Sequence, residues 1–139
     1  MIGNQASNLE LLKKIFGYAI QRLEETDSSG MKSSVFAQRA TLIFSDNSKL
    51  YVTEKLAKGK IVSFQYDWVN EEGQSLGSYH SEAHDDEDYR TETEPYHAHP
   101  PQHAKLTNKT RFPNHAYNDL FSIVEGIFLF SILPKKPKI

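Results

Sequence analysis

The first hydrophobic pattern of the chain has the spacing of an amphipathic helix. Its apolar residues recur every three or four positions, which places them on one side of a helix. This stripe consists of Leu9, Leu12, Ile15, Phe16, Ala19, Ile20 and Leu23. Ser7 or Asn8 can cap the first turn, and the turn-forming segment TDSSGMKSS ends the pattern. The sequence therefore predicts a helix over residues 8–25.

From Val35 onward, the apolar positions recur with a period of two, which is typical of β-strands. Short polar turns separate four such segments, VFAQRATLIF, SKLYVTEKLA, KIVSFQYDWV and QSLGSYHSE. Strands that are joined by turns this short are antiparallel neighbours in a sheet. In the third segment, alternate residues share a face of the strand. One face carries Val62, Phe64, Tyr66 and Trp68, and the other carries Ile61, Ser63, Gln65 and Asp67. We expect an antiparallel meander of about four strands over residues 35–82.

A second helical pattern lies near the C-terminus. Its broad apolar face consists of Leu120, Ile123, Val124, Ile127, Phe128 and Leu133. A stripe this broad indicates a helix largely buried against the sheet, and Pro134 ends it. The sequence thus predicts a helix over residues 115–133 and a basic tail over residues 134–139. The predicted fold class is α+β, with a meander packed against an N-terminal and a C-terminal helix.

The composition indicates one packed domain over residues 1–139. An apolar content of 38% supports a core, and the absence of cysteine excludes disulfides and thiolate metal sites. The N-terminal residues lack the basic and apolar regions of a signal peptide. The longest apolar run, LFSIVEGIFLFSIL, is too short to span a bilayer. We therefore expect a cytoplasmic protein that does not contact a membrane.

Histidine and acidic residues are concentrated in one segment. Residues 79–103 contain five of the six histidines, together with a run of carboxylates. The rest of the chain is consequently more basic than the overall net charge of -2 suggests. Its basic residues are spread out, so the charge pattern permits nucleic-acid binding without requiring it. This segment, the His-rich loop, is the candidate functional surface.

The His-rich loop permits a metal site. In an extended segment His97 and His99 point to the same side, and His103 follows four residues later. Imidazole nitrogens at this spacing can bind a divalent metal such as Zn²⁺. The ligands that complete the set would be His80, His84 or Glu94. The alternative is a solvated loop without a cofactor, whose histidines bond to neighbours or to water.

The same histidines also permit acid–base chemistry on RNA without a metal. One imidazole can take the 2′-hydroxyl proton while another protonates the leaving oxygen, because histidine titrates near neutral pH. The cations available to hold a phosphate are Arg90, Arg111 and Lys105. Tyr79, Tyr89 and Tyr96 can stack on bases, although tyrosines beside a sheet are more often core or rim residues. No Walker loop, GxGxxG motif or nucleophile elbow is present.

The order of motifs resembles the TumE-type toxin family of toxin–antitoxin modules. The chain has FQYDW, the turn NEEG, a strand ending in an aromatic residue, an Ala-His pair, an acidic spacer and PYHAH. The corresponding residues are Tyr66, Asp67, Trp68, Gly73, Tyr79, Ala83, His84, Pro95, His97 and His99. The chain departs from the family at Ser81 and Glu82, and it lacks a proline and one histidine that the family favours next to His84. The specific part of the resemblance covers residues 66–99.

The resemblance implies a small cytoplasmic toxin that a helix-turn-helix antitoxin neutralises and that inhibits translation or cleaves RNA. Our hypothesis is a toxin acting on RNA or translation, with His84, His97 and His99 at the catalytic centre and Tyr79 orienting them. The substrate would contact Arg90, Arg111, Lys105 and Tyr96. The rival hypotheses are a metal-binding module with His84, His97, His99 and His103 as ligands, and a non-catalytic protein-interaction domain. A homodimer is compatible with each of them.

Overall fold

The computed structural model describes residues 2–81, 97–99, 112–113 and 119–135, and it has an α+β fold. One antiparallel sheet contains the described strands in chain order from β1 to β7. They are β1 (Ile20–Glu24), β2 (Ala37–Phe44), β3 (Lys49–Ala57), β4 (Lys60–Val69), β5 (Ser75–His80), β6 (His97–His99) and β7 (Phe112–Pro113). The helices are α1 (Leu9–Ile15) and α2 (Leu120–Ile127), which continues as the π-helix η2 (Phe128–Ile132) and the 3₁₀ turn η3 (Leu133–Lys135). The predicted fold class is confirmed.

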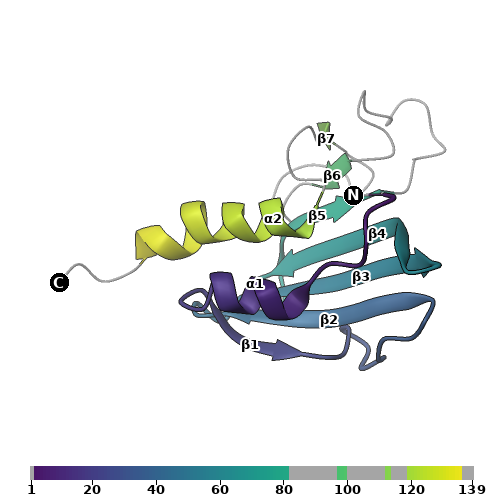
Figure 1. The fold of residues 1–139 in the computed structure, drawn as a ribbon. Helices are drawn as coiled ribbons and strands as arrows, with labels where there is room; N and C mark the ends of the chain where they lie inside the picture. Colours follow the sequence, from purple (N-terminus) through teal and green to yellow (C-terminus); the bar gives the residue numbers. More distant parts are fainter. Residues whose placement is uncertain (1, 82–96, 100–111, 114–118, 136–139) are drawn as a thin grey trace.

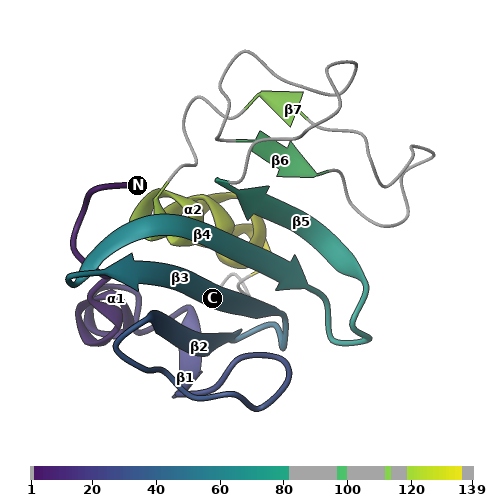
Figure 2. The same cartoon turned by 90° about the vertical axis from the view of Figure 1, so that its right-hand side faces the viewer.

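Both helices cover the same face of the sheet, and the core lies between them and the strands (Figures 1 and 2). Phe16, directly after α1, joins the two helices through ring contacts with Phe121 and Phe128 at 5.4 and 5.9 Å between ring centroids. The strands contribute buried residues that include Ala40, Leu42, Phe44, Leu50, Val52, Phe64 and Tyr66. We call the opposite side of the sheet the outer face.

The helix predicted over residues 8–25 is wrong in its second half. Asn8 caps α1 as expected, because its side chain accepts a hydrogen bond from the Leu11 N–H at 3.1 Å. The helix ends at Ile15, and after a turn through Gly17 the chain continues as β1. Residues 20–24 gain a ladder of hydrogen bonds with β2, which a helix over the same residues would lose. Ile20 and Leu23 fit the helical spacing, but they face the core from a strand.

The predicted meander is present as β2 to β5, and three further strands extend it within the described residues. Phe64, Tyr66 and Trp68 share the core face as expected. Val62 does not, because β4 has an extra residue between the pairs that join Lys55 to Ser63 and Leu56 to Ile61. This bulge leaves Val62 half exposed and buries Ile61 in its place. The His-rich loop also contains a short strand, β6, and β7 lies beyond it in the sheet.

The C-terminal helix α2 begins at Leu120 in the described part of the chain. The range 115–133 included residues 115–118, which lie outside the described part of the chain. Asp119 has an extended backbone and caps α2, with its side chain accepting a hydrogen bond from Ser122 N–H at 2.7 Å. The helical path then continues past Pro134 to Lys135. As predicted, its apolar side is buried against the sheet.

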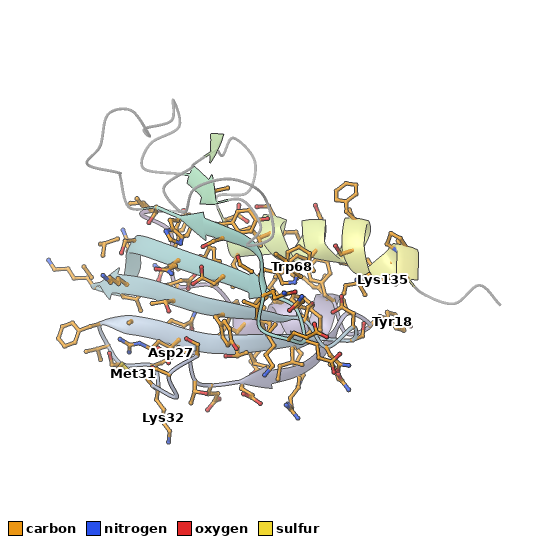
Figure 3. The ribbon with its side chains drawn as sticks, turned by 180° about the vertical axis from the view of Figure 1, so that it is seen from behind. Tyr18, Asp27, Met31, Lys32, Trp68 and Lys135 are labelled. Atoms are coloured by element: carbon orange, nitrogen blue, oxygen red, sulfur yellow. The ribbon has the colours of Figure 1, made fainter. Side chains whose placement is uncertain are left out.

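The loop over residues 25–36 packs against the outer face of β2. Thr41 donates to the Thr26 carbonyl at 2.7 Å, and Arg39 donates to the Lys32 carbonyl at 2.9 Å. Arg39 also lies 3.6 Å from the Asp27 carboxylate. Figure 3 shows Asp27, Met31 and Lys32 beside β2, seen from the side opposite to that of Figure 1. The loop therefore covers the outer face of β2, next to the polar positions on the outer face of β3 to β5.

Candidate functional site

The outer face of the sheet carries two rows of polar positions that cross neighbouring strands. The pairing of β3 to β6 gives the first row as Tyr51, Asp67, Ser78 and His99. The second row is Thr53, Gln65, His80 and His97. Directly paired residues of antiparallel strands belong to one face of the sheet. The two cross-strand rows thus bring residues from distant parts of the chain to neighbouring positions.

A hydrogen-bonded group lies at the centre of the rows. Ser78 Oγ donates to Asp67 Oδ1 and lies 2.7 Å from His80 Nε2. The His80 Nε2 atom is also 3.6 Å from Asp67 Oδ1, and Gln65 donates to the other carboxylate oxygen at 2.7 Å. Gln65 and Asp67 come from β4, whereas Ser78 and His80 come from β5. The strand register therefore assembles this group.

The directions of these hydrogen bonds fix the tautomer of His80. A serine hydroxyl has one proton, and Ser78 donates it to Asp67. Ser78 Oγ must therefore accept at its contact with His80, so the hydrogen is on Nε2 of the imidazole. In a serine-nucleophile triad the hydroxyl donates to the imidazole instead. The arrangement consequently does not prepare Ser78 for nucleophilic attack, because its hydroxyl donates to Asp67 and not to His80.

Asp67 supplies the negative charge of the group. Burial works to raise the pKa of its carboxyl. Hydrogen bonds from His80, Ser78 and Gln65 lower that pKa by more, so it lies below the ordinary value of 3.8. Asp67 is therefore ionised at neutral pH, and its charge lies beside the His80 imidazole.

The structure describes the backbone of two predicted site residues in β6. His97 pairs with His80, and His99 pairs with Ser78. Tyr79 lies on the other face, where it pairs with Tyr66 and packs against the core. The structure does not bring Tyr79 to the face that carries Ser78 and His80. Its assigned role in orienting the histidines stays a prediction.

The remaining predicted site residues lie outside the described part of the chain. They are His84, Arg90, Tyr96, His103, Lys105 and Arg111. Among the described residues, no three side chains of the ligating types are grouped so that they could hold a metal ion. The catalytic and metal-ligand assignments of these residues stay predictions.

Sequence reasoning missed Asp67 and Ser78 and gave His80 only a supporting role. The signal that could have found the group is the two-residue alternation in FQYDW and GSYHS, combined with the turn between them. A hairpin over residues 65–80 places 67 opposite 78 and 65 opposite 80.

A second polar group lies on the core side. The carboxylate of Glu54 is fully buried and accepts hydrogen bonds from Ser7 N–H, Ser7 Oγ, Gln38 Nε2 and Tyr66 OH. Burial, and then the charge of Glu54, raise the pKa of Tyr66. Its hydroxyl therefore remains a donor, at 2.6 Å from Glu54. Since no solvent reaches the carboxylate, we assign this group to stability; it ties the N-terminal segment to the sheet.

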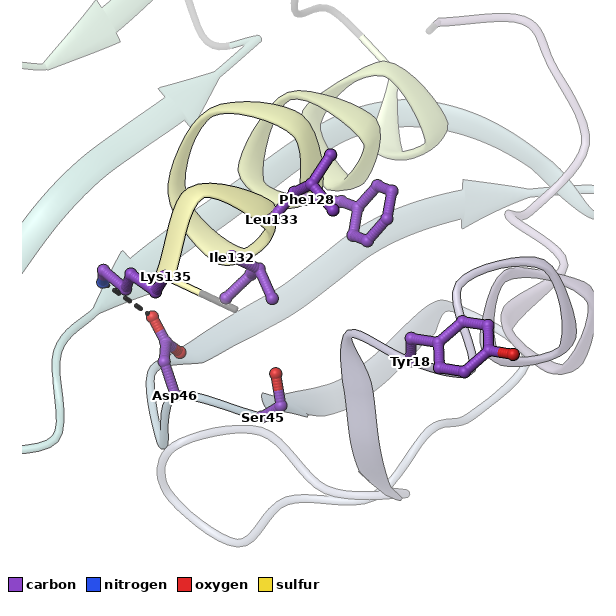
Figure 4. A pocket seen from close by; sticks show the side chains of 7 residues that line it. All are labelled: Tyr18, Ser45, Asp46, Phe128, Ile132, Leu133 and Lys135. Atoms are coloured by element: carbon purple, nitrogen blue, oxygen red, sulfur yellow. Dashed lines mark hydrogen bonds and ion pairs between the residues drawn. The ribbon is translucent and has the colours of Figure 1, made fainter. Parts of the chain in front are cut away.

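A pocket of about 410 Å³ lies at the C-terminal helix (Figure 4). Its lining is mainly apolar and comes from Tyr18, Phe128, Ile132 and Leu133. Lys135 closes one side through an ion pair with Asp46 at 3.2 Å. The pocket contains no histidine among its described lining residues, so it is separate from the cross-strand rows.

In the described residues, no helix combines the length and apolar character needed to cross a membrane.

Comparison with known families identifies the chain. The profile of the TumE family, described as Toxin TumE, matches residues 10–128, which include all but the first residue of α1, the whole of α2 and all the described strands. The chain belongs to the TumE toxin family. No curated protein and no solved structure gives a significant match. The resemblance inferred from residues 66–99 is thereby confirmed over most of the chain.

Membership of the TumE family makes the protein a toxin of a toxin–antitoxin system, with an antitoxin as its partner. The profile does not assign roles to residues. For the TumE toxin, the candidate centre therefore rests on geometry. The two cross-strand rows combine an ionised carboxylate, an imidazole with a hydrogen on Nε2, and the backbone positions of two further histidines.

Proposed function

We propose that this TumE toxin acts on RNA and that the two cross-strand rows form its catalytic centre. The observation that supports the proposal most is the pair of Asp67 and His80 on the outer face, in register with the His-Ala-His strand β6. Acid–base cleavage of RNA needs two groups that exchange protons near neutral pH, and imidazoles meet this need. The activity would belong to the cytoplasm, where its antitoxin, proposed to carry a helix-turn-helix domain, would neutralise it.

The proposed reaction is an internal transesterification. The imidazole of His97 or His99 removes the proton of a 2′-hydroxyl, and the 2′-oxygen attacks the adjacent phosphorus. The bond from phosphorus to the 5′-oxygen breaks, and protonated His80 gives its proton to that oxygen. The products are a 2′,3′-cyclic phosphate and a free 5′-hydroxyl. Asp67 stabilises the imidazolium of His80 before transfer, in the same way that a carboxylate orients and stabilises histidine in other catalytic groups.

The test is cleavage of an end-labelled single-stranded RNA by the purified toxin, with detection of the cyclic phosphate. His80→Gln should lower the rate about 100-fold or more, since general acid–base catalysis contributes about 10²–10⁴-fold. Asp67→Asn should also lower the rate, because it removes the charge beside His80. Glu72→Gln, an exposed carboxylate in the turn of the same hairpin, is the matched control and should cleave normally.

Cleavage by His80→Gln at the rate of the unaltered toxin would rule out His80 as the acid. Loss of activity in EDTA, restored by one divalent metal, would instead support the metal-dependent use of the same histidines. Elemental analysis of the purified toxin and of a His97→Ala variant distinguishes these two cases directly. In cells, induced expression should arrest growth, and alanine at both His97 and His99 should relieve the arrest.

A further inference from the structure

Strand β3 extends the polar outer face away from the histidines. Its alternate residues Lys49, Tyr51, Thr53 and Lys55 lie on that face, while Leu50, Val52 and Glu54 face the core. Tyr51 is half-buried and pairs directly with Asp67 of β4. Thr53 pairs with Gln65 in the same way. Each cross-strand row therefore begins on β3 and ends at a histidine position of β6.

The distance along a row suits a short piece of polymer. Neighbouring strands lie about 4.8 Å apart, so β3 and β6 are separated by about 14 Å. On the far side of β3, the loop over residues 25–36 covers β2 through its contacts with Arg39 and Thr41. A ligand that occupies the rows would thus extend from Tyr51 on β3, across β4 and β5, to β6.

The charges on this strip favour an anion at the β3 end. Lys49 and Lys55 flank Tyr51 and Thr53 on the outer face of β3. Asp67 supplies the carboxylate on the outer face of β3 to β5. Its oxygens accept hydrogen bonds from Ser78 and Gln65, and His80 lies beside it. Repulsion of a phosphate by Asp67 is therefore reduced by its own partners.

We propose that β3 is the binding platform for single-stranded RNA, with Tyr51 stacking on a base and Lys49 and Lys55 contacting phosphates. This inference rests on the proposed function and names its substrate. An aromatic side chain on a sheet surface can stack on unpaired bases with little dependence on sequence. The bases of a duplex are stacked and are not available to Tyr51. The toxin consequently binds single strands in preference to double-stranded RNA.

The experiment measures Kd by fluorescence anisotropy with a labelled single-stranded RNA of about 12 nucleotides, within the usual site size of such surfaces. The protein carries His80→Gln, so that the RNA stays intact during the titration. Adding Tyr51→Ala should raise Kd about 10- to 100-fold, whereas Tyr51→Phe keeps the ring and should bind normally. Tyr18→Ala is the control, because Tyr18 is 84% exposed and lines the separate pocket at the C-terminal helix.

A second measurement does not depend on the ring. Adding Lys49→Ala should reduce the slope of log K against log salt by about 0.7, the value for one phosphate contact on a single strand. If either alanine variant unfolds, as judged by circular dichroism, the other still tests the platform. A duplex of the same sequence should bind more weakly than the single strand.

The outcomes separate this inference from the proposed function. If the unaltered toxin cleaves RNA but Tyr51→Ala and Lys49→Ala bind like their parent, the platform is overturned and the catalytic proposal stands. If the unaltered toxin neither binds nor cleaves RNA, both are overturned. Weaker binding by both alanine variants, with cleavage dependent on His80, supports both.

Discussion

Replacing Tyr66 by phenylalanine isolates one buried hydrogen bond. The ring would keep its stacked contact with Phe64, whose centroid lies 4.7 Å away. The substitution removes only the hydroxyl that donates to Glu54 at 2.6 Å. One oxygen of Glu54 then keeps Ser7 Oγ as its donor, and no water reaches it because the residue is fully buried. The bond to a charged group is therefore lost without replacement.

The expected cost is about 1.5–3 kcal/mol, the range for hydrogen bonds to charged groups. For a domain of this size, 1 kcal/mol lowers Tm by about 4 °C, so Tyr66→Phe should lower Tm by about 6–12 °C. A loss of this size is a large part of the total stability of about 5–15 kcal/mol that domains have. Thermal and urea unfolding, followed by circular dichroism, measure the change.

The control is Tyr18→Phe, an exposed tyrosine for which we expect a change below about 0.5 kcal/mol. A double-mutant cycle adds Glu54→Gln, which replaces the charged acceptor by a neutral one. In that background Tyr66→Phe should cost less, because a neutral hydrogen bond contributes only about 0.5–1.5 kcal/mol. A cost below about 0.5 kcal/mol for Tyr66→Phe, without coupling to Glu54, would refute the stabilising role of this hydrogen bond.

Two further substitutions test single interactions. Asp67 has a depressed pKa in the folded protein, so it stabilises the fold above pH 3.8, the ordinary value, and this contribution is lost as the pH falls through the depressed pKa. Asp67→Asn should therefore be less stable than the unaltered protein at pH 7, with the difference shrinking below about pH 4 in urea titrations; a difference that persists at low pH would contradict this. Asp119→Ala should cost about 1 kcal/mol because it removes the cap of α2, while Asp119→Asn should cost little. Equal losses for the two Asp119 variants would argue against capping.

The strands could be predicted from the sequence because one face of each contacts the core. Residues such as Leu50, Val52 and Tyr66 alternate with polar neighbours, and the turns between them are short. The end of α1 could not be predicted in this way. Ile20 and Leu23 fit both a helical stripe and a strand, and the ladder to β2 that decides between them is a tertiary interaction.

The candidate site was only partly visible in the sequence. The composition of the sequence points to the His-rich loop. Its strand β6 has the extended backbone that places His97 and His99 at positions on one face. The grouping of Asp67 with Ser78 and His80 depends on strand register, and a shift by one residue would move each of them to the other face. The bulge at Val62 shows how such a shift arises within a strand that otherwise alternates regularly.

The order of the strands has a consequence for synthesis of the toxin. Each strand from β2 onward has its chain predecessor as a sheet neighbour, so hairpins can pair one after another as the nascent polypeptide leaves the ribosome. Residues 120–135, which cover the apolar side of these hairpins, are translated after them. Chains that stop before them leave Leu50, Val52 and Tyr66 uncovered, and such products are targets for chaperones and proteases. Burial of this apolar side therefore requires translation to continue through the C-terminal helix.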